Sequence, residues 1–419
     1  MYAGIVDTAE QKMISRDSNN SRPVFLKRLV LQNYKSIASC DIQFQPFTAL
    51  VGPNGAGKSN VLDSLRFVGD ALRNSLEWAF RDRGGIQEVR RRSAGHPTHF
   101  GIRMELQLHD GREVVYAFKV GATVGGFTVQ QEECDIWRKS EGVKSASCYR
   151  IQAGKLVKAT QELPAAVESD RLYLGLISGL AEFRPVFDGL TRMGFYNLNP
   201  AAIRELQAAD PADVLSRDGG NITSILHRIE SADESIKRRI EEYLETVVPD
   251  IKGVGVKHLG PKETIEFRQA VVSKDPWRFL AANMSDGTLR VLGVLVALFQ
   301  ACLDLRRPIP LIGIEEPEIA LHPAAASTLA SALLEASKST QVVITSHSPD
   351  LLDHEDIPSQ SVLAVIADKG KTVIGPVDIA SRKALHDRLY TPGELLRLQQ
   401  LQPEPQSDIQ QELFGVRQA

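Results

Sequence analysis

The most informative stretch of this 419-residue chain is Gly52-Pro53-Asn54-Gly55-Ala56-Gly57-Lys58-Ser59, which fits the pattern GxxxxGK[ST]. Glycines at these positions let the backbone wrap around a phosphate group with its N–H groups pointing inward, and the helix that follows adds its positive end. In such a loop Lys58 reaches the β- and γ-phosphates and Ser59 holds Mg²⁺. The stretch therefore predicts a site for the phosphates of a nucleotide.

The residues on either side of the loop support this prediction. The apolar run Thr48–Val51 precedes it as a strand, and apolar residues recur with helical spacing over 61–72 after it. Two further apolar runs, Ile309–Ile314 and Val342–Thr345, flank an Ala/Leu-rich helix over Ala324–Ala336. A strand, a helix and a strand at this spacing predict a parallel sheet covered by helices.

Polar residues follow both of the later strands. Glu315 and Glu316 end the first, and His347 ends the second. A P-loop ATPase needs one carboxylate that binds Mg²⁺ through water and another that orients the attacking water, and a histidine at the same edge can sense the γ-phosphate. The alternatives are an acidic turn and a structural histidine. Ser285 or Asp286 can cap the helix expected after residue 288, and an ordinary capped helix start explains them equally well.

Composition narrows the class of protein. Hydrophobic residues make up 43% and charged residues 24%, which is ordinary globular usage, and the net charge of −3 excludes a basic coat of the histone kind. Four cysteines without a CxxC pair suggest neither a zinc site nor a disulfide framework. The longest apolar stretch, Val291–Leu303, is shorter than the ~20 residues that a membrane span needs, and the N-terminus has no signal-peptide pattern. We therefore expect a cytoplasmic protein.

Six motifs together give the chain a family resemblance. They are LQNYKSI (31–37), GPNGAGKSN (52–60), DGGNITSIL (218–226), MSDGTLR (284–290), IEEPEIALHP (314–323) and TSHSPDLLD (345–353). In this order they resemble the ABC-type ATPases of the SMC/RecF/OLD-like group, and more narrowly the short "AAA family" ATPases with a RecF-like head and no long arms. The resemblance implies an α/β ATPase head with a mostly parallel sheet, an N-terminal antiparallel β subdomain and a helical insertion.

The resemblance also implies roles for individual residues. Gly52–Ser59 resembles the Walker A loop and extends to Asn60, Glu315 takes the Walker B position beside Mg²⁺ with Ser59, and Glu316 and His347 resemble the catalytic Glu and the switch His. Ile319–His322 resembles the D-loop. The remaining nucleotide-binding residues that it implies are Lys35, Ser36, Ser285, Asp286 and Gly287. The glutamine of the Q-loop is left open among Gln87, Gln107, Gln130 and Gln131.

Partners follow from the same resemblance. In the family the signature segment, here Ser285–Gly287, caps the ATP of the opposite protomer, so two copies sandwich two ATP molecules. OLD-like nucleases carry a C-terminal Toprim domain, whereas about seventy residues follow His347 here, and Asp353, Glu355 and Asp356 favour a polar surface turn. We therefore expect a chain that hydrolyses ATP, does not itself cut DNA, and switches a separate effector such as a nuclease in anti-phage defence or DNA repair.

Two other functions stay open at this point. A transporter ATPase subunit shares the head fold, but it normally reads LSGGQ and Asp-Glu where this chain has MSDGT and Glu-Glu. A non-hydrolysing, ATP-bound scaffold does not need Glu316. DNA is a possible partner through a basic cluster, whose alternative is a solvated face; the cluster consists of Arg81, Arg83, Arg90, Arg91 and Arg92, with Arg103 beyond.

The expected division of the chain has five parts. They are a flexible tail (1–22), an N-terminal ATPase lobe with the β subdomain (23–160), a helical insertion lobe (161–253), a C-terminal ATPase lobe (254–397) and a second flexible tail (398–419).

Overall fold

The computed structural model describes most of the chain between residues 25 and 414. The described residues are 25–93, 97–138, 147–164, 168–211, 213–270, 276–303, 307–387, 389–404 and 413–414. The tail expected over 1–22 lies outside them, as does most of the tail expected over 398–419. The five-part division of the chain stays a prediction.

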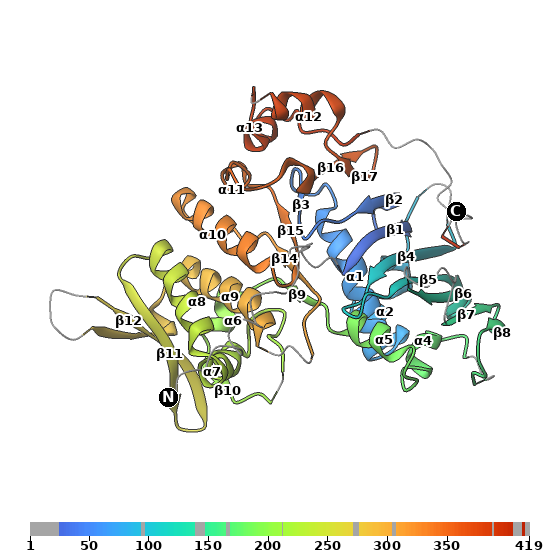
Figure 1. Ribbon diagram of the computed structural model, residues 1–419, viewed down its shortest axis with the longest axis horizontal. Coiled ribbons are helices and arrows are strands. Elements are labelled where there is room, and N and C mark those ends of the chain that lie inside the picture. Colours follow the sequence, from blue (N-terminus) through green and yellow to red (C-terminus); the bar gives the residue numbers. More distant parts are fainter. Residues whose placement is uncertain are drawn as a thin grey trace, which may run out of the picture.

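A six-stranded sheet runs through the middle of the molecule (Figure 1). Its strand order is β17-β16-β3-β15-β14-β9, and all neighbours are parallel except β17, which pairs antiparallel with β16. The strands are β3 (Phe47–Val51), β9 (Gly194–Tyr196), β14 (Leu311–Glu315), β15 (Gln341–Ser346), β16 (Val362–Asp368) and β17 (Lys371–Pro376). The mostly parallel sheet predicted from the apolar runs is confirmed.

Alternation along these strands divides the interior into two cores. Leu50, Leu311 and Val343 point into one hydrophobic cluster, and their neighbours Ala49 and Ile312 point into the other. Successive side chains of a strand lie on opposite faces, so a fully apolar strand has to be covered on both sides. The first face is covered by α1 (Lys58–Arg73), α2 (Leu76–Arg81), α4 (Tyr173–Leu176) and α5 (Arg184–Thr191). The second is covered by α6 (Pro200–Arg204), α7 (Ile222–Ala232), α8 (Glu234–Val247), α9 (Asp286–Phe299) and α10 (Pro323–Ala336).

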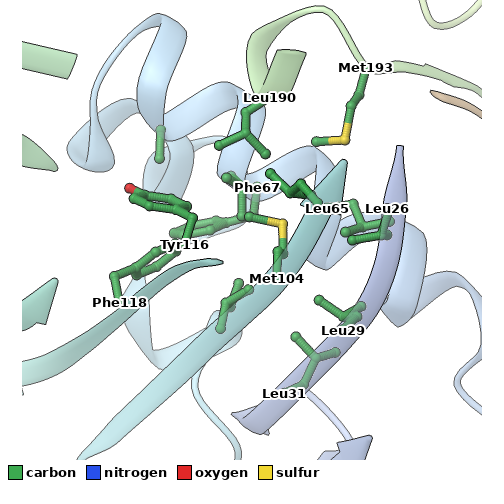
Figure 2. Packing of buried hydrophobic residues seen from close by; sticks show 14 of the residues in the cluster. Leu26, Leu29, Leu31, Leu65, Phe67, Met104, Tyr116, Phe118, Leu190 and Met193 are labelled. Carbon is green, nitrogen blue, oxygen red and sulfur yellow. The ribbon is translucent and has the colours of Figure 1, made fainter. Parts of the chain in front are cut away.

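A second, fully antiparallel sheet packs on the α1 side of the first. Its order is β2-β1-β4-β5-β6-β7-β8. Its strands are β1 (Leu26–Tyr34), β2 (Ile37–Gln43), β4 (His99–Gln107), β5 (Glu113–Thr123), β6 (Gly126–Trp137), β7 (Ser147–Gln152) and β8 (Lys155–Ala159). Figure 2 shows Leu29 of β1, Met104 of β4 and Tyr116 of β5 gathered with Leu65 and Phe67 of α1. The β-rich region expected over 98–137 is confirmed.

The helices α4 to α8 fall within 161–253, where a mostly helical region was expected, but they cover less than half of its residues, and the region also supplies a strand to the central sheet. β9 pairs in parallel with β14 through Gly194, Phe195 and Tyr196. Three residues are too few to show a strand period in the sequence, so this strand was not predicted. A short strand, β10 (Gln207–Ala208), joins a small antiparallel sheet with β11 (Ile251–Leu259), β12 (Lys262–Gln269) and β13 (Trp277–Leu280).

The remaining α-helices are short: α3 (Ile86–Val89) packs beside α2, α11 (Pro349–Leu352) follows β15, and α12 (Ile379–His386) and α13 (Pro392–Arg397) lie toward the end of the chain. Among the described residues, no helix combines the length and the apolar character that crossing a membrane requires.

Candidate nucleotide-binding site

The loop over residues 52–59, called the nucleotide loop below, connects β3 to α1. Gly57 is the N-cap of α1 with φ 99°, in the left-handed region that glycine adopts without strain. A Cβ at this position would also meet Thr372 Oγ1 at 2.1 Å. No side chain caps the first turn of α1, and the N–H of Asn60 donates to the carbonyl of Gly57 at 3.1 Å. An uncapped helix start of this kind suits an anion.

Lys58 lies inside the loop. Its Nζ donates hydrogen bonds to the carbonyl oxygens of Gly52 at 2.8 Å and Pro53 at 3.0 Å. Burial lowers the pKa of Lys58, and the carboxylates of Glu316 and Glu318 offset part of that shift. The ammonium group is therefore held against the loop backbone, where phosphate oxygens would be stronger acceptors than the two carbonyls.

Ser36 and Lys35 lie beside the nucleotide loop, but they face different partners. Ser36 Oγ accepts a hydrogen bond from Asn60 Nδ2 at 2.6 Å and lies 2.6 Å from Thr372 Oγ1, which in turn donates to the carbonyl of Ala56 at 2.9 Å. Lys35 Nζ is 2.6 Å from the Asp63 carboxylate. Contact of either residue with a nucleotide stays a prediction. Thr372 was missed, because it lies in β17 and no sequence motif marks it.

Glu315 ends β14, and its carboxylate faces a cation from a distant part of the chain. Arg217 NH2 donates to Glu315 Oε1 at 2.9 Å. The neighbouring backbone is held by Arg290 of α9, whose guanidinium donates to the carbonyl oxygens of Leu198 at 2.8 Å, Glu315 at 3.3 Å and Glu316 at 3.1 Å. Burial lowers the pKa of Arg290. Neither arginine was proposed for these contacts from the sequence, although both stand in quoted motifs or beside one.

Glu316 has an unusual backbone conformation. Its φ is 44°, which is uncommon for a residue with a side chain. Its N–H group donates to the carbonyl of Thr345 at 3.0 Å and to the hydroxyl of the same residue at 3.2 Å. Such conformations persist where the surroundings over-determine them, and they gather at functional sites. Here the bonds to β15 and to Arg290 hold the backbone of Glu316, and its carboxylate lies near His347.

His347 follows β15 and meets both neighbouring carboxylates. Its Nδ1 is 3.5 Å from Glu316 Oε1 and 4.0 Å from Glu318 Oε1, and it is buried without a hydrogen-bond partner. Glu318 accepts bonds from Ser346 Oγ at 2.6 Å and from the N–H of His347 at 3.2 Å, while its Oε2 is also buried and unpartnered. Orphaned polar atoms of this kind mark a place for water, an ion or a ligand.

The signature segment (Ser285–Gly287) starts α9 at an exposed position. Ser285 is the N-cap and accepts a hydrogen bond from the N–H of Thr288 at 3.2 Å, while Asp286 pairs with Arg204. A Cβ on Gly287 would meet the carbonyl oxygen of Ala320 at 2.6 Å, so the segment packs closely on the D-loop. Within the part of the chain that the structure describes, no hydrogen bond or ion pair joins this segment to the nucleotide loop.

The residues present fit ATP and Mg²⁺. The start of α1, which no side chain caps, and the Lys58 ammonium suit phosphate oxygens. Ser59 is exposed and Glu315 partly exposed, which leaves a hydroxyl and a carboxylate for a metal ion that a nucleotide would also ligate. The described residues hold no cluster of three or more His, Cys, Asp or Glu side chains that would bind a metal without the nucleotide.

The basic cluster does not form the surface patch that was expected. The side chain of Arg83 is only 2% exposed and binds Asp63 and Asp70, and Arg103 is buried against Glu133. Arg91 donates to the carbonyl of Ser36. Acidic side chains and a carbonyl group from other segments bind these cations. Such partners cannot be seen from residues adjacent in the sequence. Arg83, Arg91 and Arg103 are therefore not part of a basic surface, whereas Arg81 and Arg92 are exposed, and DNA contact through the cluster stays a prediction.

A half-open groove of about 1060 Å³ lies away from the nucleotide loop, between α1, α5 and β9, and reaches Glu315 through Arg217. Several of its arginines are already bonded, such as Arg184 to Asp188 and Arg73 to the carbonyl of Thr191. The groove is therefore not assigned to the nucleotide.

Comparison with known proteins agrees with this geometry. The family described as "AAA domain, putative AbiEii toxin, Type IV TA system" matches residues 47–353, and the chain belongs to it. The "Old nuclease" of Escherichia phage P2 is 23% identical over 364 residues, which cover 78% of this chain and 57% of that protein, so the chain spans little more than half of this relative. "DNA replication and repair protein RecF" of Aliivibrio fischeri is 42% identical over 45 residues, which cover 10% of this chain and 12% of that protein.

Solved structures show the same fold. The SMC head bound to the C-winged helix domain of ScpA has a TM-score of 0.53 at 16% identity, covering 86% of this chain and 100% of that one. A Pyrococcus furiosus SMC head bound to the C-terminal domain of ScpA also has a TM-score of 0.53, at 14% identity, covering 87% and 99%. The fold is that of an SMC/RecF/OLD-like ABC-type ATPase head, as the sequence motifs predicted.

Proposed function

From its membership of this AAA domain family, we propose that the chain binds Mg²⁺ and ATP at the nucleotide loop and hydrolyses ATP to ADP and phosphate. The observation that carries the proposal is that the predicted site residues meet at the carboxyl ends of neighbouring strands. Lys58, the Glu315–Glu316 pair and His347 follow β3, β14 and β15, and β15 lies between the other two strands in the parallel sheet. The carboxyl ends of such strands form the crevice where ligands bind in open α/β sheets.

Each residue has a task that its surroundings suit. Lys58 and the first turn of α1 bind the phosphates, and Ser59 and Glu315 hold Mg²⁺, which would neutralise charge that develops on the phosphate oxygens. The Glu316 carboxylate orients the attacking water and accepts its proton. His347, whose Nδ1 has no hydrogen-bond partner among the described residues, donates to the γ-phosphate region.

The proposal includes an ATP-sandwiched pair of chains. The signature segment is exposed, unconnected to the nucleotide loop by any described bond, and presented at the free start of a helix that is otherwise buried. Helix starts bind anions, so this one suits the γ-phosphate held by a second copy. Closing and opening of the pair then follows the nucleotide state as a population shift.

The cellular role that we propose is a switch for a separate effector, such as a nuclease, in anti-phage defence or DNA repair. Its support is the resemblance to a phage nuclease on one side and to the RecF repair protein on the other. Capturing the Glu316→Gln chain from its native host with ATP present tests this role: a copurifying nuclease supports it, and a clean homodimer in cells exposed to phage or DNA damage speaks against it.

Phosphate release by the purified chain tests the enzymatic part. Lys58→Ala should abolish hydrolysis, because the variant loses the charge that the loop directs at the β- and γ-phosphates. Lys155→Ala, at an exposed lysine of β8, is the matched control and should hydrolyse ATP like the unaltered chain. Normal turnover in Lys58→Ala would overturn the assignment of the nucleotide loop.

A further inference from the structure

Arg217 is the cation nearest to the proposed metal ligand among the described ion pairs. Its NH2 is 2.9 Å from Glu315 Oε1, with 45% of the arginine side chain and 22% of the glutamate side chain exposed. The two residues are 98 positions apart in the chain. Their meeting therefore depends on the fold and is no accident of neighbouring residues.

Hydrogen bonds from the chain after β9 and from within the segment hold residues 213–221, which carry Arg217. The carbonyl oxygens of Arg217 and Asp218 accept bonds from the N–H groups of Asn197 and Asn199, both at 2.9 Å, in the chain that leaves β9. The side chain of Asp218 accepts from Ser216 Oγ at 2.9 Å. Asn221 Oδ1 accepts from the N–H of Ser216 at 2.7 Å. The backbone at Arg217 is thus fixed beside β14, while its long side chain keeps access to solvent.

We infer that Arg217 is a positioning residue that occupies the cation position at Glu315 and lowers the affinity of this carboxylate for a metal ion. The inference rests on the proposed function, because it takes Glu315 as the metal ligand. A guanidinium on Oε1 occupies one acceptor site of the Glu315 carboxylate and offsets its negative charge, and a metal ion beside the same carboxylate repels that guanidinium. Metal binding is therefore favoured when Arg217 moves away, and its exposed side chain can turn toward the groove that it lines.

The sign of the effect separates this role from ordinary support of the site. An arginine that merely orients Glu315 for the metal would, when removed, weaken metal binding. An arginine that competes with the metal would, when removed, strengthen it. A partly exposed pair of this kind is weak, so the dissociation constant for the metal should fall by about two- to fivefold in Arg217→Gln.

Electron paramagnetic resonance of free Mn²⁺, titrated into the full chain with the non-hydrolysable analogue AMP-PNP, measures that constant without any turnover. Arg217→Gln should bind Mn²⁺ more tightly, and Arg217→Lys, which keeps the competing charge, should bind it like the unaltered chain. Arg228→Gln is the matched control, because Arg228 pairs with Asp213 rather than with Glu315. In a Glu315→Gln background the Arg217→Gln effect should vanish, since the shared carboxylate is gone.

Two results would overturn the inference. Unchanged or weaker Mn²⁺ binding by Arg217→Gln would show that Arg217 does not compete with the metal. Binding of a fluorescent ATP analogue in the presence of a chelator tests the proposed function separately. Loss of that binding in the unaltered chain would overturn both, whereas retained binding with an unchanged Mn²⁺ constant would overturn the role of Arg217 alone.

Discussion

The nucleotide loop and the signature segment carry equally recognisable motifs, but they are held in opposite ways. The loop is bonded on several sides: Lys58 donates to carbonyl groups of the loop, and Thr372 of β17 donates to the carbonyl of Ala56. In the signature segment Ser285 and Asp286 are exposed, and the bonds of their side chains stay within α9 or reach Arg204.

The contrast between the bonded loop and the exposed segment suggests separate tasks: nucleotide binding within one chain, and contact between two chains. The bonds that shape the nucleotide loop all come from this chain, so we expect one chain to bind the nucleotide without a second protein. The signature segment stands on a helix buried from Thr288 to Phe299, so we expect its exposed residues to form a rigid point of contact for a second copy. Variants near the nucleotide loop should therefore impair the reaction within one chain, and variants in the signature segment should impair pairing of two chains.

Glu316→Gln should produce the largest change, at the interior side. Without a base for the attacking water, kcat should fall by about 10²- to 10⁴-fold, whereas nucleotide affinity should stay within about threefold because Lys58 and α1 are untouched. Single-turnover hydrolysis together with equilibrium binding of an ATP analogue measures both quantities. A parallel loss of affinity would mean that Glu316 belongs to the binding part of the site.

Ser285→Arg should be next, at the exposed side. A long cation at the N-cap should block the second copy and lower ATP turnover by about a hundredfold, while a single chain still binds the nucleotide. Light scattering coupled to size exclusion, run on the Glu316→Gln background with ATP, reports the pairing. Ser231→Arg, at an exposed serine that ends α7, is the matched control. Intact pairing in Ser285→Arg would show that the signature segment does not contact a second copy.

Asp63→Asn should reduce stability rather than chemistry. Burial raises the pKa of Asp63, but Arg83, Lys35 and Arg66 outweigh that and hold the pKa at about 2, below the ordinary 3.8. A depressed pKa contributes stability above the unfolded value that is lost as the pH falls through the folded one. The variant should therefore lose about 2 kcal/mol from neutral pH down to about 5, and less below about 4.

Urea unfolding at pH 7, 5 and 3.5 checks this pH dependence. Asp250→Asn, at an exposed aspartate that precedes β11, should change little at any of these values. If the cost of Asp63→Asn disappeared already at pH 5, the network around α1 would not be held by this carboxylate.

Arg92→Ala should have the smallest effect. Arg92 is 67% exposed and pairs with Glu88 four residues earlier in the chain, and such surface pairs contribute less than about 1 kcal/mol. We expect a change in unfolding free energy below about 0.5 kcal/mol and no change in retention on heparin. A clear loss of retention in Arg92→Ala would instead support contact with nucleic acid through the exposed part of the basic cluster.

Local patterns in the sequence reached most of the fold and of the site. The nucleotide loop, the two acidic residues after β14 and the histidine after β15 follow from strand runs that end in polar residues, and the helix capped by Ser285 follows from its N-cap pattern. Each of these signals is contained in a short stretch of sequence, which is the range over which periodicity and capping act.

What escaped the sequence depends on contacts across the chain. Arg217 meets Glu315 across 98 residues, and β9 joins the sheet with three residues. The arginines at 83 and 103 looked like a solvated or DNA-binding run because their carboxylate partners, among them Asp63 and Glu133, lie in other elements. No propensity or spacing within one segment encodes such partners.

The left-handed backbone at Glu316 has a consequence for how such a chain can change. A conformation of this kind costs about 1–3 kcal/mol for a residue with a side chain, and glycine would relieve it. Selection for stability alone would therefore drive this position toward glycine, whereas selection for the proposed hydrolysis would retain the glutamate despite its cost.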